Sequence, residues 1–538
     1  MHFMHDLLES LAKHSNRPLF KRYTGSIAGS TTVPSWTSIS YGTYLNDLNN
    51  AAAYWKCHLD RLGVQENEVV GIWVTGLHYA DLVHLYALIR AGFIPQVFNL
   101  AMLSKGPMIN ELLHVRAGKA FIYDKYYAAE VQHVRVPTAV IPELSSIPVT
   151  PPSQLGSLPQ AQDEDVAVIF HTTGTTSGRP KSVPQTHKWL KCQSQVNWPG
   201  AWQGGDGSQK CFNNLGSFGS VGSATAINYL SPTGQCLIQT SKPDFDADEF
   251  LAMVRKEGLN NMLLFASWFS KLLKVARTSP EVLEALRSMQ QISYTGEALN
   301  PDDARWVVEQ GIPVAVIYAT TETAICMVSD LKDPGNLPSM RLIEGMNCKL
   351  LLRRISASSE AAEDPGHDEH LFDFFVPEDA GNCPHSSVRN RPDGHITGDL
   401  FEETRPGYYI FRGRSDDWIR TGHGRLGFCD TKAIEDNVKL TCSDLVQNCV
   451  VVGNAKPVVL FVEPASAFAE SVRNPIELKA EILKRLGPFE ASLYAHERIE
   501  GRVVIVPPGS LPRTKEKGNI RRKAVEEDFA GILEEIYS

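Results

Sequence analysis

The segment Val166-Ala-Val-Ile-Phe170, followed by His171-Thr-Thr-Gly-Thr-Thr-Ser-Gly-Arg-Pro-Lys181, decides the fold of this chain. The first five residues are apolar and mostly β-branched or aromatic, which is typical of a buried strand. The strand leads into a loop with five hydroxyl side chains, two glycines and a lysine, and helical periodicity resumes near Lys188. Backbone N–H groups freed by glycine, hydroxyl groups and a positive charge are the donors that hold a polyphosphate. The simpler alternative is a surface turn, because Ser, Thr and Gly also cluster in turns.

The loop does not match the Walker A motif of P-loop ATPases and kinases. That motif places its lysine directly after a glycine, whereas Arg179 and Pro180 separate Gly178 from Lys181 here. Pro180 also lacks the backbone N–H that the motif needs as a donor. The sequence therefore argues against a P-loop enzyme.

The composition is that of an ordinary globular protein. The chain has 538 residues, of which 43% are hydrophobic and 21% charged, a length that suggests roughly three to four domain-sized units. Its formal net charge of -9 argues against a nucleic-acid partner. No apolar run approaches the roughly 20 residues of a membrane span, and residues 1–9 lack the apolar core of a signal peptide. Ten cysteines without a C-x-x-C pair predict free, buried thiols in a reducing compartment, so we expect a cytoplasmic protein without a membrane partner.

Strands and helices alternate along most of the chain. Strands expected at residues 69–74 and 94–99 flank an amphipathic helix at residues 82–90, and the alternation returns over residues 248–318. This rhythm predicts parallel sheets covered by helices. From about Arg341 short strands and turns take over. We therefore predict an α/β fold whose large N-terminal domain consists of stacked α/β sheets plus a small β unit.

A second domain is expected after Gly413-Arg-Ser-Asp-Asp417, which follows a predicted strand. A separate β-α-β pattern begins beyond it, with helices at residues 434–438 and 476–485 and strands at residues 449–452, 458–462 and 502–506. We predict an N-terminal domain at residues 1–413, a connection at 414–417, and a small α+β C-terminal domain at 418–538.

Three further polar segments follow predicted strands. They are Thr295-Gly-Glu297, Tyr318-Ala-Thr-Thr-Glu322 and Thr397-Gly-Asp-Leu400. Ligands bind at the carboxyl ends of strands in open α/β sheets. We therefore expect these segments and the hydroxyl-rich loop to meet at one site.

In their order, these motifs resemble those of the adenylate-forming (ANL) superfamily, which includes acyl-CoA synthetases, adenylation domains of nonribosomal peptide synthetases, and luciferases. The motifs are Thr172-Thr-Gly-Thr-Thr-Ser-Gly-Arg-Pro-Lys181, Tyr318-Ala-Thr-Thr-Glu322, Thr397-Gly-Asp-Leu400, Gly413-Arg-Ser-Asp-Asp-Trp-Ile-Arg420 and Leu511-Pro-Arg-Thr-Lys-Glu-Lys-Gly-Asn-Ile-Arg-Arg522. They cover most of the chain, and five motifs in order are far more specific than one. The stretch Asp430-Thr-Lys-Ala-Ile-Glu-Asp-Asn-Val438 most closely resembles fungal adenylation–carrier–reductase proteins.

The resemblance implies an AMP-forming carboxylate ligase. Such an enzyme uses ATP to convert a carboxylic acid to an acyl adenylate, releases pyrophosphate, and passes the acyl group to a thiol. The implied cofactors are ATP and Mg²⁺, with CoA or phosphopantetheine as the thiol. The implied partners are a small-molecule carboxylic acid and an acyl or peptidyl carrier protein.

The resemblance also assigns the phosphate and metal contacts. The residues that match the holder of the β- and γ-phosphates are Thr172, Thr173, Gly174, Thr175, Thr176, Ser177 and Lys181. Glu322 matches the Mg²⁺ ligand, because this hard cation takes oxygen ligands. The hydroxyl of Thr321 is expected to meet the α-phosphate. A solvated surface carboxylate is the simpler alternative for Glu322.

The residues that match the contacts to adenosine are Tyr318, Ala319, Thr320, Gly296, Glu297, Ala298, Asp399 and Arg414. Tyr318 matches the aromatic ring that stacks on adenine, and residues 296–298 match the loop on the other side of the base. Asp399 matches the carboxylate that accepts the ribose hydroxyls, and Arg414 matches its partner. Outside these motifs, such a tyrosine would be a core residue and such an aspartate a turn residue.

The resemblance further implies a mobile C-terminal domain. Asp416 matches the hinge about which this domain swings between the half-reactions, with Asp417 as the adjacent alternative. Lys517 matches the lysine that reaches the carboxylate and the α-phosphate, a role that suits a long, flexible point charge. Lys515 remains the alternative, because the usual lysine follows the glycine of this motif, where this chain has Asn519.

The pocket for the acid is implied at residues 212–223, with Ser217, Phe218 and Val221 as substrate contacts. The aspartate that clamps the α-amino group in peptide-synthetase members has no counterpart at residues 212–216. We therefore expect an acid without that ammonium group, either aryl or aliphatic.

Other functions compete with this interpretation. The phosphate loop is one residue longer than the common form, and with Asn519 it is also compatible with a nucleotide-binding pseudoenzyme. No carrier signature follows the last motif, so an excised adenylation domain of a carboxylic acid reductase is another alternative. A Rossmann oxidoreductase is disfavoured, because no G-x-G-x-x-G opens a helix after a strand.

Overall fold

The fold is that of a computed structural model, which describes most of the chain. The described residues are 2–28, 31–99, 106–149, 155–172, 180–205, 207–296, 298–352, 371–415, 418–420, 428–453, 456–468, 475–491, 493, 497–514 and 518–538. Within these ranges, no helix combines the length and the apolar character needed to span a membrane.

Sixteen α-helices and twenty-six strands are assigned in the described residues. The helices are α1 Met4–Lys13, α2 Tyr41–Arg61, α3 Tyr79–Arg90, α4 Gly106–Val115, α5 His187–Cys192, α6 Trp198–Ala201, α7 Val221–Ala224, α8 Ala226–Leu230, α9 Ala247–Glu257, α10 Ala266–Ala276, α11 Pro280–Arg287, α12 Pro301–Glu309, α13 Thr431–Thr441, α14 Ile476–Glu490, α15 Arg522–Asp528 and α16 Ala530–Tyr537. The strands are β1 Pro18–Tyr23, β2 Ser26–Ala28, β3 Thr31–Val33, β4 Trp36–Ser40, β5 Val69–Trp73, β6 Ile94–Phe98, β7 Ala120–Tyr123, β8 Thr138–Val140, β9 Val166–His171, β10 Ser182–Thr186, β11 Cys211–Asn213, β12 Cys236–Ile238, β13 Asn261–Phe265, β14 Gln291–Thr295, β15 Val314–Thr320, β16 Ala324–Ser329, β17 Met340–Leu342, β18 Lys349–Leu352, β19 Leu371–Pro377, β20 Gly394–Arg405, β21 Tyr408–Arg414, β22 Trp418–Arg420, β23 Phe428–Asp430, β24 Val446–Val452, β25 Val459–Pro464 and β26 Val503–Ile505. The helices and strands named above from the sequence all form, with small shifts at their ends.

The first large sheet contains the strand that precedes the hydroxyl-rich loop. Its order is β10-β9-β6-β5-β7-β8, and all pairs are parallel except β10 with β9. The antiparallel strand β10 was not expected from the sequence. It lies at the edge of the sheet, where the missing N–H of Pro184 costs no ladder bond. The strands β9 and β10 pair on either side of the hydroxyl-rich segment, and α5 follows β10.

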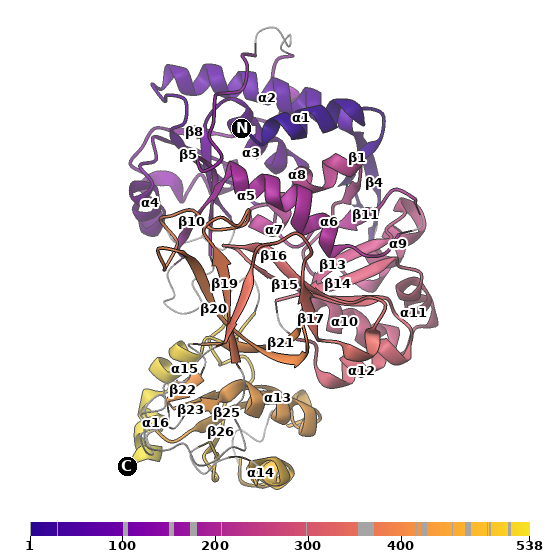
Figure 1. Ribbon diagram of the computed structural model, residues 1–538, viewed down its shortest axis with the longest axis vertical. Coiled ribbons are helices and arrows are strands. Elements are labelled where there is room, and N and C mark those ends of the chain that lie inside the picture. Colours follow the sequence, from indigo (N-terminus) through magenta and orange to yellow (C-terminus); the bar gives the residue numbers. More distant parts are fainter. Residues whose placement is uncertain are drawn as a thin grey trace.

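The second large sheet has thirteen strands in the order β18-β19-β20-β21-β17-β16-β15-β14-β13-β11-β12-β1-β4. Its strands from β12 to β15 run parallel, whereas those from β15 to β18 pair antiparallel. The change of direction falls at β15, which ends at Thr320. The small β unit expected from about Arg341 thus begins earlier, with β16 at Ala324, and it continues the same sheet (Figure 1).

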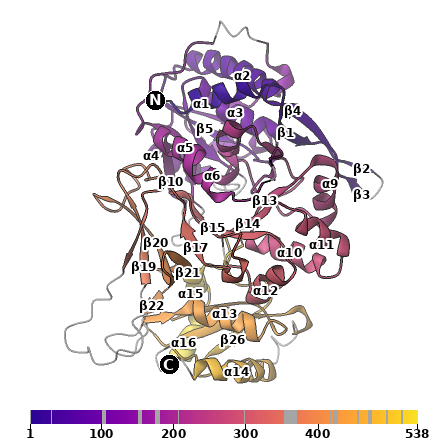
Figure 2. The same cartoon turned by 45° about the vertical axis from the view of Figure 1, so that its right-hand side comes forward.

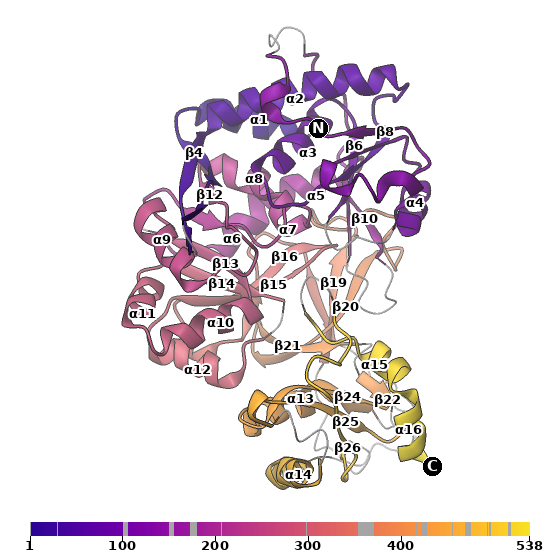
Figure 3. The same ribbon diagram turned by 180° about the vertical axis from the view of Figure 1, so that it is seen from behind.

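The two largest hydrophobic clusters of this part of the molecule pack its helices and sheets together. One packs α2 and α3 against the first sheet and includes Trp55, Leu82 and Phe170. The other includes Phe269, Tyr294 and residues from both halves of the second sheet. Figure 3 shows α9 to α12 gathered beside β13 and β14, and Figure 2 shows the β2–β3 hairpin projecting from the surface.

The C-terminal residues form a separate α+β unit at the opposite end of the molecule from α1 and α2 (Figure 1). Its three-stranded sheet has the order β24-β25-β26. Alternate residues of β24 belong to different clusters: Val451 faces the cluster that contains α13 and α14, and Val450 faces the cluster that contains α15 and α16. A strand that is buried on both faces has no solvent-exposed side that would favour polar residues. This explains the continuous apolar runs in this region.

The cysteines are free thiols, as the sequence predicts. Most are buried, but Cys57 on α2 is exposed and Cys192 at the end of α5 is half-buried. The structure therefore corrects the expectation that all of these thiols lie in the core.

One buried histidine, His84, and one half-buried histidine, His171, are held in the neutral form. On α3, His84 accepts a hydrogen bond from Trp55 Nε1 at 3.1 Å and donates from Nε2 to the carbonyl of Pro142 at 3.1 Å. Burial lowers the pKa of His84 to about 4. Burial likewise lowers the pKa of His171 to about 4, and its ring contacts the carbonyl of Val97 at 2.8 Å.

We expect the free energy of unfolding to fall as the pH is lowered through this range. Between about pH 6.5 and pH 4 the unfolded chain binds more protons at these histidines, so each contributes a loss of at most about 1.4 kcal/mol per pH unit. Urea unfolding at pH 7.5 and pH 5.5 measures the slope. A His84→Gln variant cannot be protonated and should be less stable at pH 7.5 with a shallower slope. If the variant showed the same change in the free energy of unfolding with pH as the wild type, His84 would not contribute to that pH dependence.

Candidate active site

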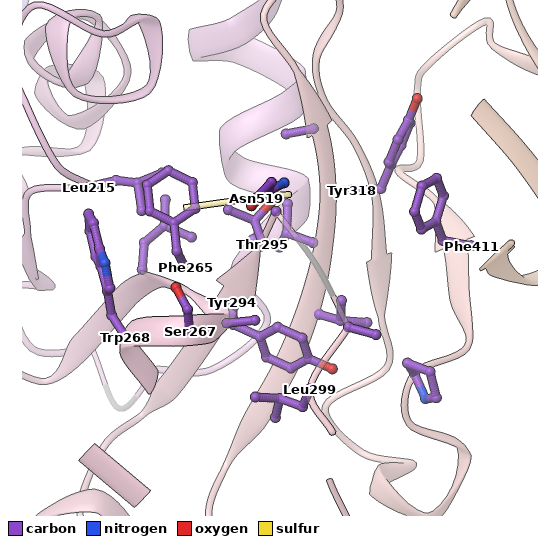
Figure 4. Close-up of a pocket in the computed structure, with 18 of the residues that line it drawn as sticks. Leu215, Phe265, Ser267, Trp268, Tyr294, Thr295, Leu299, Tyr318, Phe411 and Asn519 are labelled. Carbon is purple, nitrogen blue, oxygen red and sulfur yellow. The ribbon is translucent and has the colours of Figure 1, made fainter. Parts of the chain in front are cut away.

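A cavity of about 1540 Å³ lies where the carboxyl ends of the parallel strands meet the C-terminal unit. It is lined by the ends of β13, β14 and β15, by β20 and β21, and by residues that follow the last sheet strand. Figure 4 shows Leu215, Phe265 and Trp268 at one end and Tyr318 and Phe411 at the other. The segments that the sequence predicts to meet therefore border one cavity.

Tyr318, Asp399 and Arg414 form a connected group on three strands of the second sheet, β15, β20 and β21. Tyr318 Oη donates to Asp399 Oδ2 at 2.5 Å, and Arg414 Nη1 lies 3.3 Å from Asp399 Oδ1. Asp399 and Arg414 are direct partners in the β20–β21 register. Burial, and next the charge of Asp399, raise the pKa of Tyr318 well above its usual range, so the phenol stays a proton donor. A neutral phenol and a guanidinium thus hold one buried carboxylate in place.

The ring of Tyr318 is fixed by other aromatic side chains. Its centroid lies 4.9 Å from that of Phe401 in an edge contact and 6.4 Å from that of Phe411, with the planes of Tyr318 and Phe411 26° apart. Phe411 also lines the cavity. Aromatic packing of this kind fixes the ring orientation, so this end of the cavity offers flat apolar surface.

The segment after Tyr318 is anchored through its backbone. Gln185 Nε2 donates to the carbonyl of Thr321 at 2.6 Å, and Trp189 Nε1 donates to the carbonyl of Glu322 at 3.0 Å. The hydroxyls of Thr320 and Thr323 lie 2.9 Å apart. Because the backbone is held, the side chains of residues 319–322 remain available at the cavity wall, which they line.

The Glu322 carboxylate is half-buried at this wall. It forms no ion pair with any described residue. Burial lowers the pKa of His395, and the negative charge of the nearby Glu322 carboxylate partly opposes this decrease. An open carboxylate in a cavity suits a hard cation, which prefers oxygen ligands.

The base of the hydroxyl-rich loop is closed by backbone and side-chain bonds. Thr172 N donates to the carbonyl of Lys181 at 2.9 Å, and Lys181 N donates to Thr172 Oγ1 at 3.2 Å. Thr172 lines the cavity, whereas Lys181 is exposed and is not among the described lining residues. The predicted phosphate contacts Thr173, Gly174, Thr175, Thr176 and Ser177 lie outside the described residues.

The loop after β14 borders the middle of the cavity. Gly296 has φ +91°, and a Cβ added there would come within 3.0 Å of the Phe265 ring. Glycine is thus required by both the backbone angle and the space. Ala298 is exposed and also lines the cavity. Glu297 lies outside the described residues.

The opposite end of the cavity has apolar and aromatic walls. Phe265 and Trp268 meet edge to face with centroids 4.7 Å apart, and Leu215 and Val221 line the same region. Ser217 lines it too, and its Oγ accepts from Gly219 N at 3.0 Å.

Phe218 does not join Ser217 at the wall. It is only 1% exposed, belongs to the hydrophobic core, and packs on Phe20 with centroids 5.8 Å apart. The structure corrects its assignment as a substrate contact, because its ring points into the core while Ser217 borders the cavity. Phe265 and Trp268 were not predicted, although the position of Phe265 at the end of a parallel strand is a usable signal.

The C-terminal unit contributes a hairpin to the cavity wall. Arg513 and Ile520 form a β-bridge, and Gly518, Asn519 and Ile520 line the cavity. Lys515 and Lys517 lie between these bridge partners in the sequence and outside the described residues. Asp416 and Asp417, the predicted hinge positions, also lie outside them.

Comparison with known proteins gives concordant matches over nearly the whole chain. The model of the AMP-binding enzyme family matches residues 9–351, and that of the AMP-binding enzyme C-terminal domain matches residues 429–538. The chain is 32% identical over 524 residues to the AMP-binding domain-containing enzyme iboA of Amanita muscaria (strain Koide BX008), with 94% of this chain and 98% of iboA covered.

Solved structures share the same fold. ATP-bound MatB from Rhodopseudomonas palustris matches with a TM-score of 0.73 at 18% identity, covering 99% of this chain and 100% of MatB. The o-succinylbenzoate CoA synthetase MenE from Bacillus subtilis, in complex with the acyl-adenylate intermediate OSB-AMP, matches with a TM-score of 0.73 at 16% identity, covering 97% of this chain and 98% of MenE. The α/β architecture with a separate C-terminal region is therefore that of these enzymes.

Proposed function

The chain belongs to the AMP-binding enzyme family and is an AMP-forming carboxylate ligase, and from this premise we propose how its residues bind ATP and the acid. The reaction joins the acid to the α-phosphate of ATP and releases pyrophosphate, and the acyl group then passes to a thiol. The observation that carries the proposal is the Tyr318–Asp399–Arg414 group, which borders the same cavity as Thr172, Thr321 and Glu322.

Adenosine binds at the end of the cavity that contains Tyr318. The adenine ring stacks on the flat surface of Tyr318, with residues 296–298 on its other side, and the ribose hydroxyls donate to Asp399. The support for this placement is the fixed orientation of the Tyr318 ring and the paired state of Asp399. A carboxylate that is already held by two donors loses little freedom when it accepts further hydrogen bonds.

The triphosphate extends from there toward the hydroxyl-rich loop and Thr321. Residues 172–177 and Lys181 hold the β- and γ-phosphates, and Thr321 meets the α-phosphate. Glu322 holds Mg²⁺ together with phosphate oxygens, and the ion lowers the repulsion between triphosphate and carboxylate. The carboxylate of Glu322 fits this role, because it is half-buried at the cavity wall and forms no ion pair with a residue that the structure describes.

The acid occupies the end lined by Leu215, Ser217, Val221, Phe265 and Trp268. Edge-to-face aromatic walls favour an aryl or aliphatic side chain over a charged one, because a buried charge without a partner is costly. The acceptor is the thiol of CoA or of a carrier-bound phosphopantetheine, since both attack the same mixed anhydride. Lys517, or alternatively Lys515, supplies the mobile positive charge.

We propose a domain division at Asp416, with residues 1–413 and 418–538 as the two domains. It is supported by the separate hydrophobic clusters of the C-terminal unit and by the family model that covers residues 429–538. The free thiols support a reducing compartment such as the cytoplasm.

Pyrophosphate exchange across a panel of acids tests the proposal. The panel contains benzoate, octanoate, a dicarboxylate and an α-amino acid, and hydroxylamine traps any acyl adenylate. We expect exchange and hydroxamate with the aryl or aliphatic acids but not with the α-amino acid. Tight ATP binding without exchange for any acid would instead indicate a nucleotide-binding pseudoenzyme. Thioester formation with free CoA would distinguish CoA from a carrier as acceptor.

A further inference from the structure

The C-terminal unit places the uncharged amide of Asn519 at the cavity wall, and we propose that Asn519 contacts the bound acyl adenylate where nucleotide and acid join. This inference rests on the proposed function and adds to it a binding residue at the position where the usual lysine of the motif would stand. In Figure 4 the Asn519 carboxamide lies between Leu215 and Phe265 on one side and Tyr318 on the other. All four residues line the same cavity.

The backbone N–H and carbonyl of Asn519 both form hydrogen bonds with Thr514. Thr514 N donates to the carbonyl of Asn519 at 2.9 Å, and Asn519 N donates to Thr514 Oγ1 at 3.1 Å. Gly518 N donates to the carbonyl of Thr514 at 3.0 Å, with Gly518 at φ +71°. These bonds fix the direction in which the Asn519 side chain leaves the hairpin.

The hairpin is tied to the C-terminal sheet by a buried ion pair. Glu463 at the end of β25 accepts from Arg513 at 2.6 and 3.1 Å, from Leu511 N at 2.9 Å and from Asn448 Nδ2 at 3.0 Å. The Glu463 side chain is 1% exposed. A buried carboxylate with all these donors is satisfied and rigid, so Asn519 is held on a preorganised support.

The carboxamide of Asn519 forms no hydrogen bond with any described residue. It therefore has two N–H donors and a carbonyl acceptor to offer to a ligand in the cavity. An acyl adenylate presents acyl and phosphate oxygens at its centre, and both accept hydrogen bonds. A neutral amide orients these oxygens without adding charge, whereas a lysine side chain would add a positive charge.

Exchange rates of Asn519 variants test the contact, with benzoate or octanoate as the acid, whichever the wild type uses faster. We expect Asn519→Ala to lower kcat/KM for exchange about tenfold, the effect of losing one hydrogen bond to a charged group. Asn519→Asp should lower kcat/KM further, because its carboxylate would repel the phosphate of the adenylate. Added salt screens this repulsion, so it should reduce the difference in kcat/KM between Asn519→Ala and Asn519→Asp. Asn16→Asp makes the same charge change at an exposed position outside the cavity and should behave as wild type.

Asn519→Gln keeps the carboxamide on a longer side chain and should fall between wild type and Asn519→Ala, with thermal midpoints unchanged throughout. Equal rates for the wild type, Asn519→Ala and Asn519→Asp would overturn the inference. Equal losses in Asn519→Ala and Asn519→Asp, insensitive to salt, would do so as well, because the position would then only fill space. Absence of exchange in the wild type would refute the proposed function itself.

Discussion

Glu322→Gln is expected to lower the rate of pyrophosphate exchange by roughly 100- to 1000-fold. Glutamine has nearly the same shape but lacks the charge that holds a divalent cation, so the site would bind Mg²⁺ weakly. The half-reaction brings a carboxylate against a triphosphate, and a poorly held ion leaves that repulsion unscreened. Exchange measured over a range of Mg²⁺ concentrations should show a lower maximum and a higher Mg²⁺ requirement.

The folded state of this variant should be nearly as stable as the wild type. The side chain of Glu322 has no ion pair within the described part of the chain, and the local backbone is held by Gln185 and Trp189 instead. Glu344→Gln is the matched control, since Glu344 is exposed on a nearby turn and is not a lining residue. If Glu322→Gln catalysed pyrophosphate exchange as fast as the wild type at low Mg²⁺, the assignment of Glu322 as a metal ligand would be wrong.

Asp399→Ala is expected to weaken ATP binding by about 30- to 100-fold. The loss corresponds to roughly 2–3 kcal/mol, the range for hydrogen bonds to a charged group. The substitution removes the proposed acceptor for the ribose and also the partner of Tyr318 Oη, so the ring proposed to stack on adenine loses one of its restraints. Titration calorimetry with ATP measures the change directly.

Two companion variants separate these contributions. Tyr318→Phe keeps the ring and removes only the hydrogen bond to Asp399, so its affinity for ATP should fall only a few-fold. Asp393→Ala removes an exposed carboxylate that pairs with Arg391 at the turn before β20, and it should leave ATP affinity unchanged. If Asp399→Ala bound ATP as tightly as Asp393→Ala, the ribose would have to lie elsewhere.

Much of the fold follows from local sequence patterns. The continuous apolar runs of β9, β24 and β25 predict strands buried on both faces, because burial on each side leaves no place for alternating polar residues. The polar motifs that follow β9, β14 and β15 were expected at one site for a similar reason. Carboxyl ends of parallel strands share one edge of a sheet, so position along the chain already implies proximity.

The sequence by itself thus determined the α/β class and the family, and it predicts Tyr318, Glu322 and Asp399 as site residues, because each of these residues belongs to a short local motif. Only the tertiary structure decided that β10 returns antiparallel, that the β unit extends the second sheet, that Phe218 turns into the core, and that Phe265, Trp268 and Asn519 border the cavity. These outcomes depend on contacts between residues far apart in the chain. The periodicity of apolar residues shows which side of a strand is buried, but it does not identify the residues that pack against that side.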